Sequence, residues 1–211
     1  KKEEFLIGAG HSLSNSFDLF DDGAILKEKG RLSRAYTLFQ LSMEEAGKVI
    51  LLLDGFTMLS IHENNSGFFD KTRIDDYYKK LDNIFYDHSN KTKYIIEYEL
   101  LNLNKFIERN NTNKEAGICK QRDEVQNDLK KLKTINELKN NSLYISIENG
   151  KFIKPNIKID SKTLSSIEHK AYSKLMLTKT KSLRFLKDRK FETGVDLEYL
   201  DNLKLYSELK K

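Results

Sequence analysis

Charged residues interrupt an apolar stretch of the chain, SMEEAGKVILLLDG, at residues 42–55. Removing a charge from water costs free energy unless the charge is paired or used. Glu44 and Lys48 are four residues apart with the glutamate first, an order that favours an ion pair on one helical face. We expect Glu45 to be substantially buried and to contact Lys48 or His88. The stretch therefore predicts a buried polar site formed by Glu44, Glu45 and Lys48, and an exposed ion pair is the alternative.

A second group of chemically capable residues lies in FYDHSNKTKY, where Asp87, His88 and Lys91 fall within about one helical turn. An imidazole transfers protons near neutral pH, and a neighbouring carboxylate can orient it. A lysine can offset negative charge on a phosphate. We predict that His88 is an acid–base group, with Asp87 orienting it and Lys91 beside it. The alternative is an exposed polar turn at a helix start.

The elements that must position these residues are mostly helical. One proline and 10 glycines in 211 residues leave few helix breakers. On the second helix, the small residues Ser42, Ala46 and Gly47 would let a neighbouring helix approach closely. Gly30 suits a helix C-terminal cap. Helices are predicted at residues 3–27, 32–61, 70–81, 83–109, 121–138, 161–187 and 196–209.

The periodicity changes at residues 140–155, NNSLYISIENGKFIKP, where apolar and polar residues alternate around a predicted Asn149–Gly150 turn. Tyr144 in this segment either stacks on a base or packs. The fold class is thus all-α, a helical bundle with a short extended or β-hairpin insertion near 143–154. We expect a single helical domain over 1–211, with a core bundle at about 3–140, the insertion at about 141–160 and C-terminal helices at about 161–209.

Composition narrows the classes of protein to which this chain can belong. Cys119 is the only cysteine, which excludes an internal disulfide framework and a cysteine-rich zinc site and fits a cytoplasmic location. No apolar run reaches membrane-spanning length, so we expect no membrane association. Residues 1–67 carry a net charge of −3 and residues 68–211 a net charge of +8. The basic part can attract nucleic acid or an acidic protein, or it is simply a set of solvated lysine-rich helices.

Three motifs in order resemble the AbiV abortive-infection family, a branch of the HEPN superfamily. RAYTLFQLSMEEAGKVILL, at residues 34–52, is similar to its helix ending in Glu-Glu-x-Gly-Lys. Asp87, His88 and Lys91 match its Asp-His-x-x-Lys element. LKNNSLYISIENGKFIKP, at residues 138–155, resembles its Leu-Tyr-Val element followed by a proline. The segment after about Ser161 is not diagnostic.

The resemblance implies a HEPN-type bundle, often dimeric, that acts in bacterial phage defence. Many HEPN proteins are metal-independent ribonucleases whose signature is an arginine, four to six residues, then a histidine. None of the chain's four histidines has an arginine at that spacing upstream. The usual catalytic pair is therefore not carried over. The positions that match are Glu44, Glu45, Lys48, Asp87, His88 and Lys91.

Two functions remain open from the sequence. The first is an abortive-infection effector that arrests growth or translation on infection by RNA cleavage, as a homodimer triggered by a phage protein and without a cofactor or metal. The second is a non-catalytic module whose polar core is structural and which acts through a protein partner. A di-iron enzyme is a weaker third option, because its bundles need Glu-x-x-His repeats and the chain has none.

Overall fold

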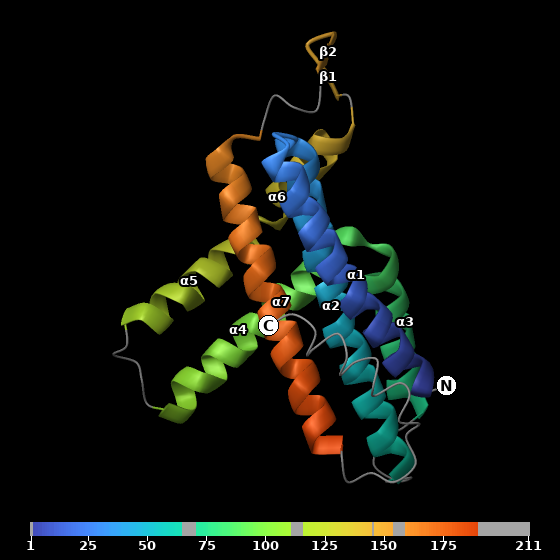
Figure 1. Cartoon of the computed structure of the whole chain (residues 1–211). Coiled ribbons are helices and arrows are strands. Elements are labelled where there is room, and N and C mark those ends of the chain that lie inside the picture. The colour runs from blue at the N-terminus through green and yellow to red at the C-terminus, as the bar shows by residue number, and fades with distance from the viewer. Residues whose placement is uncertain (1, 65–70, 111–115, 145, 154–158, 190–211) are drawn as a thin grey trace.

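The computed structural model describes residues 2–64, 71–110, 116–144, 146–153 and 159–189, which form seven helices and one β-hairpin (Figure 1). The helical bundle predicted from the sequence is confirmed. The helices are α1 (Lys2–Glu28), α2 (Leu32–Asn64), α3 (Lys71–Tyr86), α4 (His88–Asn110), α5 (Ala116–Lys130), α6 (Leu132–Leu143) and α7 (Ser161–Arg189), and the strands are β1 (Ser146–Glu148) and β2 (Lys151–Ile153).

Helix α2 is the centre of the bundle. From Val49 to Leu53 its side chains are buried in every direction, which is why this stretch is apolar all round. Helix α1 packs along α2 through a shared apolar cluster. The turn between them closes as predicted, because Gly30 has a φ of +70° and the Arg31 N–H donates to the Leu26 carbonyl.

Helix α7 is tied to four other helices by ion pairs. Its Glu168 accepts from Lys27 of α1 at 2.6 Å, and its Lys170 pairs with Asp128 of α5 at 2.5 Å. Its Lys174 pairs with Glu99 of α4, and its Lys181 pairs with Asp54 of α2. Lys174 and Glu99 are both buried, and burial lowers the pKa of Lys174 to about 8. The helix after the insertion is therefore part of the core rather than an appendage.

Helix α4 crosses α2 at a glycine. A Cβ atom on Gly47 would lie 2.5 Å from the Lys91 carbonyl oxygen and 3.6 Å from the Ile95 side chain. The backbones can approach this closely only because residue 47 has no side chain. A hydrogen bond of 2.9 Å from Gln40 Nε2 to Thr92 Oγ1 joins the same two helices. The predicted close approach at this small residue is confirmed.

Two helix boundaries were predicted wrongly. The predicted break near residue 82 does not exist: α3 continues to Tyr86 and α4 begins at His88. The actual break is at Asp87. Its Oδ1 caps the start of α4 by accepting from the backbone N–H groups of Ser89 at 2.7 Å and Asn90 at 3.3 Å. The predicted helix at 121–138 is two helices separated at Lys131.

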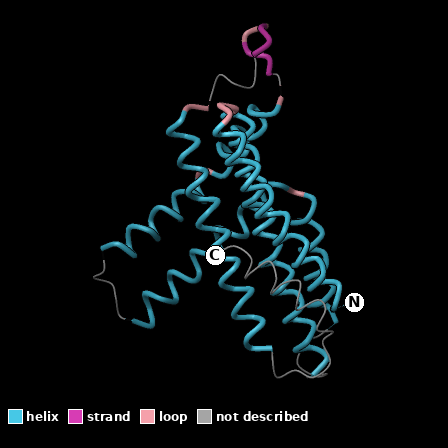
Figure 2. The backbone as a smooth tube through the Cα atoms, in the orientation of Figure 1, coloured by secondary structure: helices cyan, strands magenta, loops and turns pink. Residues whose placement is uncertain are grey.

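The hairpin projects from the end of the bundle, clear of the helices (Figure 2). Its strands pair antiparallel, with Ser146 opposite Ile153, around the predicted Asn149–Gly150 turn, where both residues have positive φ. At its tip Phe152 is 79% exposed. Tyr144, before the hairpin, is also exposed, so it does not pack in the core. The predicted helix at 196–209 lies outside the described residues.

We predict that Gly47→Ala destabilises the protein by about 1–3 kcal/mol, because the new methyl group meets backbone of α4 that must move. Urea unfolding followed by circular dichroism measures the change. Gly117→Ala is the matched control: nothing lies within 4 Å of the added Cβ, so this change should be neutral or stabilise the helix by up to about 1 kcal/mol. Equal effects of the two substitutions would contradict the contact.

We predict that Lys174→Met lowers the free energy of unfolding by about 3–5 kcal/mol, because it leaves Glu99 as a buried carboxylate without its partner. The double variant Lys174→Met/Glu99→Leu should recover most of this loss, since no buried charge remains. Thermal unfolding of both variants tests the pair. A double variant as unstable as the single one would show that the charge pairing is not the cause.

Candidate functional site

Glu44 is the centre of the polar site. Its residue is 2% exposed, and its two carboxylate oxygens have different partners. Oε1 accepts from Lys139 Nζ at 2.7 Å, and Oε2 is 2.5 Å from His88 Nδ1. The expected pairing of Glu44 with Lys48 is therefore wrong. Glu44 instead joins three helices, because it lies on α2, His88 begins α4 and Lys139 lies on α6.

His88 is buried on one side and open on the other. Its side chain is 57% exposed although Nδ1 is bonded to the buried Glu44. A carboxylate accepts hydrogen bonds, so the geometry assigns the proton to Nδ1. In the neutral ring, Nε2 then carries the lone pair, and it has no protein partner among the described residues. This is the arrangement of a histidine oriented by a carboxylate and available as a base.

Glu45 and Lys48 form a second pair beside the first. Glu45 Oε1 accepts from Lys48 Nζ at 2.5 Å, and their side chains are 15% and 18% exposed. The predicted contact of Glu45 with a basic group of the site is confirmed. Lys48 Nζ also lies 5.7 Å from the centre of the Phe85 ring, a cation–π contact with α3.

Lys91 is buried close to both pairs. It is 6% exposed and has no carboxylate within 4 Å among the described residues. Burial lowers the pKa of Lys91, and the positive charge of Lys48 lowers it further, whereas the carboxylates of Glu44 and Glu45 oppose the shift. A negative group close to Lys91 would stabilise its charged form.

The structure gives Asp87 a different role from the predicted one, and it adds Lys139 to the site. Asp87 caps the start of α4, and its Oδ2 accepts from the Asn90 side chain at 3.1 Å. The carboxylate bonded to His88 is that of Glu44, so Asp87 positions His88 only by fixing the helix start. Lys139, buried against Glu44, was not among the predicted site residues. The signal for it was a lysine on the buried side of a helix, one turn after Ile135.

Apart from the exposed Asp87, the site contains two carboxylates and three lysines, so this part has a net charge of +1 when His88 is neutral. It can orient one histidine and attract an anion at the same place. Within the described ranges, no three His, Cys, Asp or Glu side chains gather in a group able to hold a metal ion.

Comparison with protein families identifies the family of the chain. The HEPN_AbiV model, described as AbiV, matches residues 4–175. The chain belongs to the AbiV family. The match spans both charged clusters, α6, the hairpin and the first half of α7, so the AbiV resemblance of the three motifs is confirmed. No curated protein and no solved structure gave a match. In the described part of the chain, no helix has the length and apolarity needed to cross a bilayer.

We predict that Glu44→Gln changes the tautomer of His88, because a neutral amide can accept from or donate to Nδ1 whereas a carboxylate only accepts. Nitrogen-15 NMR of the imidazole should show Nδ1–H in the wild type and a mixture in the variant. Asp87→Asn is the control and should leave the His88 signals in the wild-type pattern. A wild-type ring protonated at Nε2 alone would contradict the assignment.

Proposed function

We propose that this AbiV-family protein is an abortive-infection effector that cleaves RNA in the cytoplasm without a metal ion and thereby arrests growth. A role in abortive infection or defence follows from the family. The chemical part rests on one observation: the His88 ring is more than half exposed while its Nδ1 is held by the buried Glu44. A histidine held in this way resembles the orienting half of a catalytic triad.

The proposed reaction uses the 2′-hydroxyl of RNA as the nucleophile. His88 Nε2 takes the hydroxyl proton, the 2′ oxygen bonds to the adjacent phosphorus, and the bond from phosphorus to the 5′ oxygen breaks. Water protonates the leaving oxygen. The products are a 2′,3′-cyclic phosphate end and a 5′-hydroxyl end. Glu44 stabilises the imidazolium that forms, since it accepts from Nδ1.

The lysines would offset the charge that builds on the phosphate. Lys91 is the better candidate because it has no ionic partner among the described residues, whereas Lys48 is paired with Glu45 and Lys139 with Glu44. Its lowered pKa, caused first by burial, reflects an ammonium group that gains from a nearby anion. Glu45 and Lys139 are positioning residues in this scheme.

We further propose that the effector is a homodimer and that a phage protein triggers it. Both statements come from the family resemblance. Neither statement depends on the chemistry at His88, because dimerisation and binding of a phage protein need only an exposed surface.

A second function is supported by the same contacts. Glu44, Glu45, Lys48 and Lys139 neutralise one another, and Glu44 ties α2, α4 and α6 together. A network of this kind can have a purely structural role, which is to fix the register of the helices. The protein would then be a non-catalytic binding module that arrests growth through a protein partner.

We predict that His88→Ala lowers RNA cleavage by about 10²–10⁴-fold, because general acid–base help of this kind is removed. The variant should be less stable than the wild type, because Oε2 of the buried Glu44 loses its donor, but it should stay folded, since Glu44 keeps Lys139. Sequencing of RNA ends after expression in cells measures cleavage, and circular dichroism checks folding. His11→Ala, a change at an exposed histidine of α1, is the control.

The competing function gives a different result. If wild type and His88→Ala arrest growth equally and neither produces new RNA ends, the site is structural and the binding-module function stands. If His11→Ala loses cleavage as strongly as His88→Ala, the effect does not come from the Glu44–His88 pair.

A further inference from the structure

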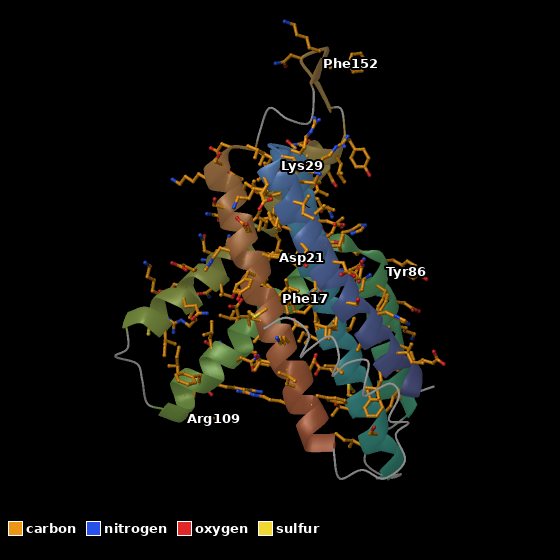
Figure 3. All side chains as sticks on the ribbon, in the orientation of Figure 1. Phe17, Asp21, Lys29, Tyr86, Arg109 and Phe152 are labelled. Carbon is orange, nitrogen blue, oxygen red and sulfur yellow. The ribbon has the colours of Figure 1, made fainter. Side chains whose placement is uncertain are left out.

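A pocket of about 300 Å³ lies between α2, α6 and α7, and none of its lining residues belongs to the Glu44–His88 site. The starts of α2 and α7 lie at the end of the bundle that carries the hairpin (Figure 1), where Figure 3 labels Lys29 and Phe152. The pocket wall combines apolar, hydroxyl and cationic side chains, and its described lining residues include no acidic one. Its cations are Lys131, Lys162 and Lys170.

A buried hydroxyl group without a hydrogen-bond partner lines this pocket. Tyr36 of α2 is 2% exposed, and its hydroxyl makes no hydrogen bond to any described residue. Burial raises the pKa of this tyrosine to about 12. The unpaired side-chain atoms that are fully enclosed belong to Gln40, Ser60 and Ser182, so the Tyr36 hydroxyl has a surface that is open to the pocket. Buried polar groups nearly always have a partner, and this one is placed to receive it from a ligand.

The start of α6 forms part of the pocket wall and has no cap. The side chain of Lys131, the residue before α6, makes no hydrogen bond to the first turn. The first N–H groups of a helix have no acceptor within the helix, and together with the helix dipole they attract an anion. Lys131 and Thr134 both line the pocket, so this helix start faces it. The start of α7 differs, because Asp160 already accepts from the Thr163 N–H at 2.7 Å.

Two of the three pocket lysines, Lys131 and Lys162, have no carboxylate within 4 Å among the described residues. Lys170 does have one, since it pairs with Asp128 at 2.5 Å. Asp160, which caps α7, acts on Lys162 only from beyond 4 Å. The described part of the pocket therefore offers two positive charges that have no ion-pair partner, beside an uncapped helix start.

We propose that this pocket binds a small phosphate monoester. Its phosphate group would lie at the start of α6, with Lys131 and Lys162 as counter-charges and the Tyr36 hydroxyl as a further hydrogen-bond partner. The hydroxyl groups of Thr134 and Ser166 line the same pocket. A volume of about 300 Å³ is enough for a small organic molecule. Its organic part would meet the apolar wall, which is formed by Ile135, Leu138 and Ile167.

A phosphate monoester suits these groups better than a carboxylate or an acidic protein does. It carries close to two negative charges near neutral pH and three strong acceptor oxygens, whereas a carboxylate has one charge and two oxygens. The two unpaired lysines and the N–H groups of α6 match the larger set of acceptors. An acidic protein would bind to the exposed lysines, but it would not reach Tyr36, which is open only to the pocket.

The test is an NMR titration of the nitrogen-15-labelled full chain with phenyl phosphate at low salt. The backbone N–H signals of Leu132, Lys133 and Thr134 should shift, and their dependence on concentration gives the Kd. Inorganic phosphate should bind more weakly, because it has no organic part. Benzoate and the diester methyl phenyl phosphate each carry one negative charge and should bind about tenfold more weakly than phenyl phosphate.

Variants locate the binding site. Lys131→Gln/Lys162→Gln should weaken phenyl phosphate binding by about tenfold or more, through loss of both counter-charges. Tyr36→Phe removes only the hydroxyl and should weaken binding about threefold to tenfold, whereas the melting temperature should not fall, because the hydroxyl has no partner in the free protein. The control Lys130→Gln/Lys133→Gln removes the same charge from exposed lysines that do not line the pocket, and it should keep most of the affinity.

Equal losses in the two double variants, unchanged binding by Tyr36→Phe, or signal shifts confined to residues outside α6 and α7 would overturn the proposal. So would the absence of binding by every probe. Benzoate or poly-glutamate that binds as tightly as phenyl phosphate would make the ligand a carboxylate or an acidic protein instead, and an equally tight diester would make it a nucleic-acid backbone. None of these results bears on RNA cleavage, since no variant changes Glu44 or His88.

Discussion

The arrangement of the site depends on one buried carboxylate. Glu44 has no access to water that could replace its hydrogen bonds, so each of its oxygens must find a donor within the protein. One donor comes from the start of α4 and the other from α6, 95 residues along the chain. Satisfying Glu44 therefore fixes where three helices meet, and it places His88 with one nitrogen held and the other open. The same contact that stabilises the bundle also orients the histidine.

The contact also requires that α2 and α4 approach closely, which explains the spacing of the motif Glu-Glu-x-Gly-Lys. Glu44 reaches His88, and Gly47, one turn later, admits the Lys91 backbone. A larger residue at 47 would push α4 away from α2 and lengthen the Glu44–His88 distance. Further along the same face of α4, Glu99 pairs with Lys174 of α7, so α7 also helps to fix the position of α4.

Much of the fold could be predicted from the sequence, because helix periodicity and scarce breakers are local signals. The starts of α2 and α7 and the Asn149–Gly150 turn follow from such signals. A helix start at Asp87 was the alternative in the sequence, but apolar residues on both sides favoured one helix over 83–109. The break at Lys131 has no side-chain cap. It depends on packing of α6 against α2, which sequence periodicity does not contain.

The residues of the site could be predicted from the sequence better than the partner that each of them contacts. Charges within an apolar helix indicated Glu44 and Glu45, but which cation each meets depends on helix rotation and on residues far away in sequence. Lys139 shows this most clearly, because its place on the apolar side of a helix signals burial, but nothing local shows that its partner is Glu44, 95 residues away.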